Sequence, residues 1–83
     1  MANKLRHREF AVIGLGRFGS GVALTLEAHD YHVLGIDQNL DIVQRLSDRI
    51  THVAALDATD EEALREIDIV SFDTVVVAIG DDF

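Results

Sequence analysis

An α/β fold is predicted by three features that follow one another along the chain. An apolar run at residues 9–14 comes first, and it leads into a G-x-G-x-x-G sequence formed by Gly14, Gly16 and Gly19. Asp37 then closes the next apolar run, close to the spacing of about 20 residues expected after such glycines. Together these features predict a Rossmann-like fold, a doubly wound parallel sheet with an adenine-nucleotide site at one edge.

The rest of the chain alternates between strand and helix patterns. Short apolar runs predict four strands, at residues 9–14, 32–37, 52–56 and 74–79. Three helices are predicted between them: residues 17–28, a helix capped by Asn39, and a helix that starts at a capping box in residues 59–62. Four strands joined by three crossover helices give a truncated doubly wound sheet with strand order 3-2-1-4.

Apolar spacing also predicts which side chains are buried. We expect the second helix to bury residues at helical spacing, namely Ile42, Val43, Leu46 and Ile50. In the third helix we expect Ala63, Leu64 and Ile67 to face inward. The strand at residues 74–79 is nearly all apolar, which is typical of a parallel strand covered on both faces.

Each glycine of the motif has a physical role in a dinucleotide site. Gly14 permits the tight turn that leaves the first strand, and Gly16 lets the backbone approach a pyrophosphate. Gly19 lets the following helix pack closely against that strand. The helix then directs unpaired N–H groups and its positive dipole end at the phosphates. Asp37 is expected to accept hydrogen bonds from the ribose hydroxyls and to repel a 2′-phosphate, which disfavours NADP.

Size and charge limit the other classes of function. The chain has 83 residues, enough for one small domain, and no cysteine, which excludes disulfides and thiolate metal sites. Its net charge of −8 disfavours nonspecific nucleic-acid binding. The four histidines lack the spacing of a metal site, and no catalytic residues are predicted. Because the net charge is negative, any phosphate ligand must be held by local dipoles and cations against an unfavourable overall electrostatic field.

We divide the chain into a short basic lead, residues 1–8, and a nucleotide-binding domain, residues 9–83. A complete doubly wound sheet would have further strands beside residues 74–79. We therefore expect the chain to be the N-terminal part of a larger protein, or a domain that a partner subunit completes.

Four segments together resemble the RCK/KTN nucleotide-binding domain, the regulator of potassium channels and of Trk/Ktr-type potassium transporters. These segments are residues 10–19 (FAVIGLGRFG), 33–37 (VLGID), 57–60 (DATD) and 75–81 (VVVAIGD). The resemblance implies a cytoplasmic, homo-oligomeric regulatory subunit, peripheral to the membrane through a transporter partner. It also implies NAD(H), ATP or ADP as the ligand. One departure is Leu56, which stands where the family commonly has glycine and could tighten the adenine pocket.

The resemblance assigns ligand contacts to particular residues of this chain. It implies phosphate contacts from Gly14, Gly16, Arg17, Phe18 and Gly19, and ribose binding by Asp37. It implies adenine contacts around Asp57, Ala58 and Thr59, with Ile79 and Gly80 lining the cleft. In the family the arginine can reach a terminal phosphate, whereas the alternative for Arg17 is a solvated first-turn side chain. Asp57 could equally cap its own loop, and Thr59 could be a helix cap.

Three functions are compatible with these features of the sequence. The first is a regulatory adenine-nucleotide-binding module, not an enzyme, that controls a potassium channel or transporter. The second is the coenzyme-binding half of an NAD-dependent dehydrogenase, which would also need a nicotinamide site and a substrate domain. The third is an assembly module that binds no nucleotide.

Overall fold

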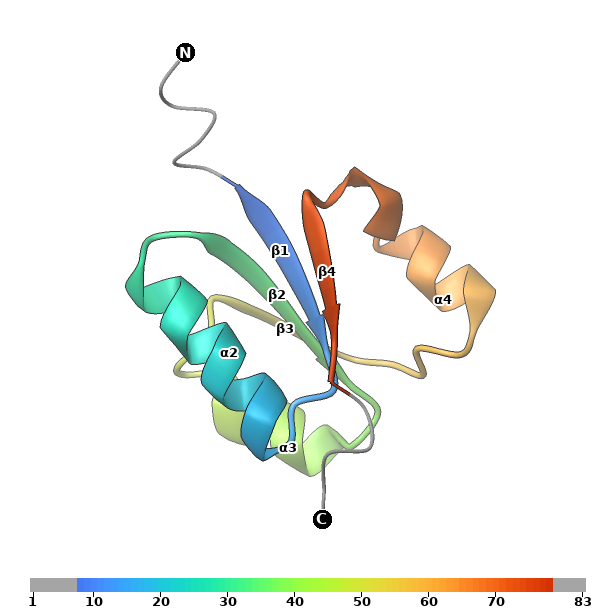
Figure 1. The fold of residues 1–83 in the computed structure, drawn as a ribbon. Coiled ribbons are helices and arrows are strands. Elements are labelled where there is room, and N and C mark those ends of the chain that lie inside the picture. Colours follow the sequence, from blue (N-terminus) through green and yellow to red (C-terminus); the bar gives the residue numbers. More distant parts are fainter. Residues whose placement is uncertain (1–7, 79–83) are drawn as a thin grey trace.

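Parallel strands joined by helices build the structure, as Figure 1 shows. This computed structural model describes residues 8–78, so residues 1–7 of the predicted lead, and residues 79–83, lie outside the described part. The elements in chain order are β1 (Glu9–Ile13), α2 (Arg17–Ala28), β2 (His32–Asp37), α3 (Leu40–Leu46), β3 (His52–Ala55), α4 (Glu61–Glu66), the 3₁₀ turn η1 (Ile69–Ser71) and β4 (Thr74–Val77).

The sheet has the strand order β3-β2-β1-β4, and its pairings are parallel. Val12 of β1 lies opposite Gly35 of β2 on one side and opposite Val76 of β4 on the other. The chain therefore runs outward from β1 through β2 to β3 and then returns to the other side of β1. The predicted order 3-2-1-4 is confirmed, and the order reverses between β1 and β4, where α/β sheets bind ligands.

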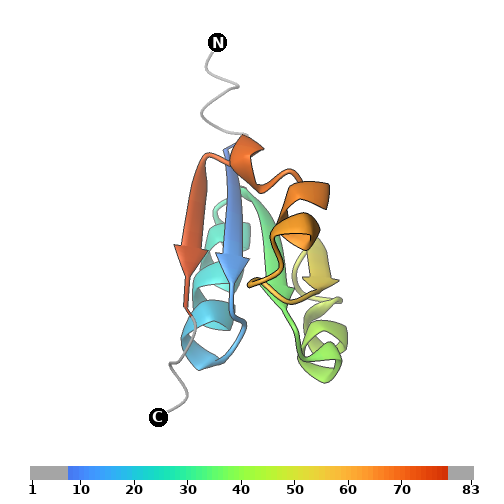
Figure 2. The same ribbon diagram turned by 90° about the vertical axis from the view of Figure 1, so that its right-hand side faces the viewer.

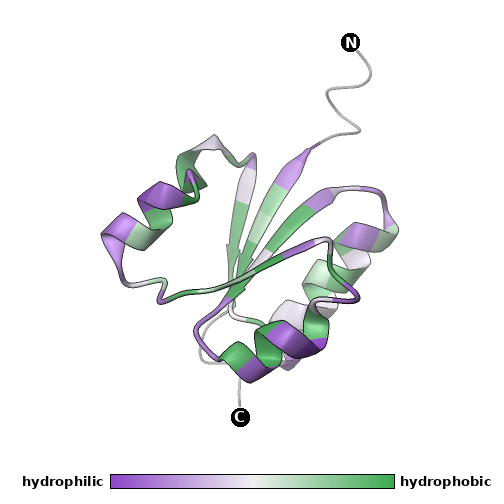
Figure 3. Ribbon diagram, turned by 180° about the vertical axis from the view of Figure 1, so that it is seen from behind, coloured by the Kyte–Doolittle hydropathy of each residue, from purple (hydrophilic) through white to green (hydrophobic). Residues whose placement is uncertain are grey.

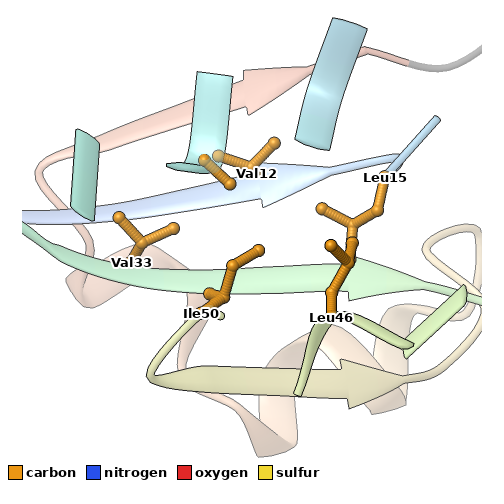
Figure 4. Close-up of a cluster of buried hydrophobic side chains, with 6 residues drawn as sticks. Val12, Leu15, Val33, Leu46 and Ile50 are labelled. Carbon is orange, nitrogen blue, oxygen red and sulfur yellow. The ribbon is translucent and has the colours of Figure 1, made fainter. Parts of the chain in front are cut away.

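Helices cover the two faces of the sheet unequally. Helices α2 and α3 lie on one face, and Figure 2 shows α4 on the opposite face. The main core lies under α2 and α3 and consists of six buried apolar side chains: Val12, Leu15, Ala23, Val33, Leu46 and Ile50. Figure 4 draws this cluster and labels all of them except Ala23. Full burial of one such aliphatic side chain stabilises the fold by about 1.5–3 kcal/mol.

The face under α4 is less well covered. Ala63, Leu64 and Ile67 are half-buried, so they form the inner side of α4 without being fully enclosed. Val75 and Val77 of β4 are 40% and 64% exposed, although Figure 3 shows β4 to be hydrophobic along most of its length. The prediction that this strand is covered on both faces is wrong for the described residues. Its α2 side is covered, because Val76 packs against the main core.

Several element boundaries differ from the sequence-based expectation. Strands β1 and β3 each end one residue before the predicted position, and α3 ends at Leu46 and not at Ile50. The Ser47 hydroxyl donates to the Gln44 carbonyl at 2.8 Å where the helix ends. Ile50 nevertheless joins the core, because a turn places its N–H 2.9 Å from the Leu46 carbonyl.

The start of α4 also differs from the prediction. Asp60, and not Thr59, is the N-cap, and its Oδ1 accepts from the N–H groups of Glu62 at 3.0 Å and Ala63 at 3.4 Å. The Thr59 hydroxyl instead donates to Asp57 Oδ1. The cap predicted for α3 is confirmed: the Asn39 side chain accepts from the N–H groups of Asp41 and Ile42.

Candidate nucleotide-binding site

The glycine loop leaves β1 through a left-handed turn. Gly14 has a φ of 96°, a conformation that side chains rarely adopt, so a glycine is required there. Its N–H donates to the Ile36 carbonyl at 2.7 Å, which extends the contact between β1 and β2 by one residue. The loop is therefore anchored at its start, and the following residues rise beyond the carboxyl edge of the sheet.

Gly19 brings α2 against this loop. A Cβ atom at Gly19 would overlap the Gly14 carbonyl oxygen and would lie 2.8 Å from the Gly14 carbonyl carbon and 3.3 Å from the Ala78 Cβ. Glycine is therefore needed at this position for close contact between helix and strand. Ala78 lies immediately beyond β4, so the same contact joins the end of β4 to the glycine loop.

The first turn of α2 is built differently from those of α3 and α4. Gly16 is its N-cap, with an extended backbone, and within residues 8–78 no side chain makes a capping hydrogen bond to it. Asn39 and Asp60 supply such bonds to α3 and α4. The first N–H groups of a helix need partners, and a bound anion satisfies them well. Gly16 thus supplies α2 with no side-chain cap of the kind that Asn39 and Asp60 supply to the other two helices.

Asp37 at the end of β2 points into the glycine loop. Its Oδ2 accepts from the Leu15 N–H at 2.7 Å, and its Oδ1 accepts from the Asn39 N–H at 2.8 Å. A carboxylate offers about four acceptor positions on its two oxygens. Within residues 8–78 two of these positions are used, and the others can accept from hydroxyl donors. Sequence reasoning placed Asp37 near the loop but missed these two hydrogen bonds.

The loop after β3 meets the same edge of the sheet. Its Leu56 N–H donates to the Asp37 carbonyl at 3.1 Å. Asp57 Oδ1 accepts from the Thr59 N–H at 2.9 Å and from the Thr59 hydroxyl at 2.7 Å. These bonds, the hydroxyl one above all, lower the pKa of the exposed Asp57 carboxyl below its ordinary value of 3.8. Asp57 therefore stabilises its own turn, which was one of the two roles predicted for it. Its second carboxylate oxygen takes no part in these two bonds.

The structure thus brings most of the predicted residues to one edge. The glycine loop, Asp37 and the segment Asp57–Thr59 follow the carboxyl ends of three neighbouring strands. Arg17 and Phe18 are exposed at the first turn of α2, Phe18 by 60%. Ile79 and Gly80, which were predicted to line the cleft, lie outside the described residues.

A shallow pocket lies elsewhere on the molecule, at the opposite edge of the sheet. It is lined by residues near the starts of β1, β2 and β3 and by one residue that precedes β4: Glu9, His32, Val33, Leu34, His52 and Phe72. Ligands of open α/β sheets bind at the carboxyl ends of the strands, and this pocket is at their amino ends. We therefore place the candidate site at the glycine loop and not in this pocket.

Comparison with known proteins agrees with this architecture. Residues 10–83 match the TrkA-N domain family, which covers most of the chain. The chain belongs to the TrkA-N domain family. The resemblance to a Trk/Ktr-type domain, inferred from four short segments, is therefore confirmed.

Individual proteins of the Ktr system are also similar to this TrkA-N domain over most of its length. Ktr system potassium uptake protein A of Bacillus subtilis is 38% identical over 77 residues, which cover 93% of this chain and 35% of the relative. Protein C of the same organism's Ktr system is 39% identical over 75 residues, covering 90% and 34%. Ktr system potassium uptake protein A of Vibrio alginolyticus is 37% identical over 79 residues, covering 95% and 36%. The chain thus spans about a third of the length of these relatives.

Among residues 8–78, no helix combines the length and the apolar character that a bilayer crossing requires.

Proposed function

We propose that this TrkA-N domain binds an adenine nucleotide, NAD(H), ATP or ADP, at the glycine loop and acts as a regulatory module and not as an enzyme. Its ligand state would control a membrane potassium channel or transporter subunit. In this proposal the domain works in the cytoplasm, within a homo-oligomer that contacts the membrane through that subunit.

The observation that carries this proposal is the position of Asp37. Its carboxylate lies 2.7 Å from the Leu15 N–H, inside the loop that follows β1. A ribose whose hydroxyls bind Asp37 would have its phosphates beside Gly16 and the first turn of α2. In a dinucleotide site the carboxylate binds the ribose and the glycine loop binds the phosphates, so the two must lie close together.

The phosphate side rests on the first turn of α2. Gly16 has no side chain to obstruct a phosphate or to cap the helix. Arg17 is the one basic residue in the motif from Gly14 to Gly19 and is exposed there. An arginine binds phosphate through charge-assisted and often bidentate hydrogen bonds. We propose that Arg17 contacts the phosphate farthest from the ribose, with Phe18 beside it.

The adenine side rests on the loop after β3. Asp57, Ala58 and Thr59 are joined to β2 through the Leu56 contact with Asp37. The free oxygen of Asp57 is an acceptor suited to the adenine amino group. We propose that this loop lies along the base, and that Ile79 and Gly80 complete the cleft from the side of β4.

The potassium role rests on the relatives' names, which describe potassium uptake proteins of the Ktr system. A nucleotide can regulate such a partner only if it binds one conformation or assembly more tightly than another. The same relatives make the dehydrogenase alternative the weaker one, since their names describe uptake proteins.

Isothermal calorimetry on the purified protein tests the proposal with ATP, ADP, AMP, NADH and NADPH. The variant Asp37→Ala should weaken each ligand that has a free ribose 2′-hydroxyl. A hydrogen bond to a charged group contributes about 1.5–3 kcal/mol, so we expect a loss of about 10- to 100-fold in affinity. The matched control is Asp48→Ala, which removes the same charge from an exposed position after α3.

Two outcomes would contradict parts of the proposal. If Asp37→Ala binds all the ligands like the wild type, Asp37 does not bind the ribose. Replacing Arg17 with alanine should weaken ATP more than AMP, because AMP lacks the terminal phosphate. An equal loss for both nucleotides would remove the phosphate role of Arg17.

A further inference from the structure

One side chain of the glycine loop points into the core of the domain. Leu15 is 3% exposed and belongs to the buried cluster under α2 and α3, whereas Gly14 and Gly16 on either side of it are half-buried. Figure 4 draws its side chain among the other members of this cluster. The residue between the first two glycines of the motif therefore ties the loop to the interior of the domain.

The Leu15 side chain lies over Gly35, in β2. A Cβ atom at Gly35 would be 3.1 Å from Leu15 Cδ1, 3.2 Å from Leu15 Cδ2 and 3.4 Å from Val53 Cγ1. The first two distances are shorter than carbon atoms ordinarily keep. A glycine inside a strand weakens the strand and often marks a place where another group approaches closely. Here that group is Leu15, whose two terminal methyl groups occupy the space that a side chain at position 35 would fill.

Three consecutive residues of β2 hold the glycine loop. The first, Gly35, lies under the Leu15 side chain. The second, Ile36, accepts through its carbonyl from the Gly14 N–H at 2.7 Å. The third, Asp37, accepts through Oδ2 from the Leu15 N–H at 2.7 Å. Leu15 thus takes part in two of the three contacts, and the next residue is the N-cap of α2, so the position of Leu15 sets where that helix begins.

We propose that Leu15 is a positioning residue for nucleotide binding, because the fit of its side chain over Gly35 holds the glycine loop in the shape that receives phosphates. This inference rests on the proposed function, since it concerns the same loop. Leu15 acts through the loop and not by touching the ligand, because its side chain is buried in the core. A loop that is already ordered loses less conformational freedom when a ligand binds, and the affinity is higher for that reason.

Two substitutions of equal chemistry separate this role from a general loss of stability. Leu15→Ala removes the atoms that lie over Gly35. The matched control, Ile50→Ala, removes a comparable volume from the same core. Because Ile50 precedes β3, it lies at the amino end of the strands, away from the glycine loop. Both variants should lower the folding stability, but only Leu15→Ala should loosen the loop.

Calorimetry measures the affinity of the folded variants for ADP. We expect Leu15→Ala to bind ADP about tenfold more weakly than the wild type does, which corresponds to the cost of ordering the backbone of roughly one loop residue. The affinity of Ile50→Ala should stay within about twofold of the wild type. Equal losses in the two variants would show that affinity follows stability and would overturn the inference, as would wild-type affinity in Leu15→Ala.

A second pair of variants tests the contact from the side of β2. Gly35→Ala places a methyl group against Leu15 and should weaken ADP binding by about threefold. Adding Leu15→Val removes both Cδ atoms, so the pair exchanges one methyl-sized volume between the two positions. The double variant should bind ADP more tightly than Gly35→Ala alone, because the two changes compensate each other. A double variant that binds more weakly than Gly35→Ala would overturn the inference.

Hydrogen exchange provides a measurement that needs no ligand. In nucleotide-free Gly35→Ala, the Gly14 and Leu15 amides should exchange at least about threefold faster than in the wild type, while the amides of α3 keep their rates. Unchanged exchange at both loop amides would overturn the inference, as would an equal increase in α3. Failure of the wild type to bind NADH, ADP or ATP would instead refute the proposed function, whereas failure of this inference leaves wild-type binding intact.

Discussion

Replacing Gly19 with alanine places a methyl group where the structure has no room for it. The new Cβ would overlap the Gly14 carbonyl oxygen and lie 2.8 Å from the attached carbon. Both atoms belong to the backbone of the turn after β1, so no flexible side chain can move aside. Helix α2 would have to shift away from β1. Overpacking of this kind costs about 3 kcal/mol of folding stability.

Gly21 provides the matched control two residues later in α2. A Cβ at Gly21 has no atom within 4 Å, and the residue is exposed. Alanine favours a helix over glycine by about 0.5–1 kcal/mol, so Gly21→Ala should stabilise the protein. The substitution of glycine by alanine is therefore expected to lower the folding stability at position 19 and to raise it at position 21.

Thermal unfolding followed by circular dichroism measures both effects. One kcal/mol shifts the melting temperature of a domain of this size by about 4–8 °C. Gly19→Ala should thus lower the melting temperature by about 10–25 °C, and Gly21→Ala should raise it by about 4 °C. Equal shifts in the two variants would refute the packing that we assign to Gly19.

Three further predictions concern a helix cap, a titrating group and the core. Asn39→Ala removes the cap of α3 and should cost about 1 kcal/mol in urea unfolding; an unchanged midpoint would contradict the cap. Thr59→Ala should raise the pKa of Asp57 toward its ordinary value of 3.8 in an NMR titration, because the hydroxyl donor is lost. Because the pKa of Asp57 is lowered in the folded state, the stability that its carboxylate contributes is fully present above pH 3.8 and is lost as the pH falls through the lowered pKa. If the pKa of Asp57 does not move in Thr59→Ala, Thr59 is not the cause of the lowering. Ile50→Ala should cost about 2–5 kcal/mol in urea unfolding, whereas Val70→Ala should cost almost nothing because Val70 is 88% exposed; similar losses would contradict the placement of the core.

Much of the fold could be predicted because the signals are local. Short apolar runs separated by helical patterns specify parallel strands, and the rule for crossovers then leaves the order 3-2-1-4. The errors also have local causes. Ile50 continues the spacing of α3 although the helix ends at Leu46, and Thr59 and Asp60 are both good caps. The hydrogen bonds that the Asp60 side chain accepts from Glu62 and Ala63 show which residue caps α4.

The site was predictable in its residues but not in their contacts. The roles of Gly14 and Gly19 follow from the motif, since each reflects a backbone constraint that only glycine meets. The two hydrogen bonds of Asp37 depend on how far apart two loops lie in space, which no spacing in the sequence reports. The apolar sequence of β4 likewise does not show how much of the strand is buried by other parts of the chain.

The central claim is that an adenine nucleotide binds at the carboxyl edge of the sheet, between the glycine loop and Asp37. Adding ADP to ¹⁵N-labelled protein and following the amide resonances tests this claim most directly. We expect changes at Leu15, Gly16 and Asn39, with His32 and His52 at the opposite edge unchanged. Changes confined to His32 and His52, or no changes at saturating ADP, would contradict it.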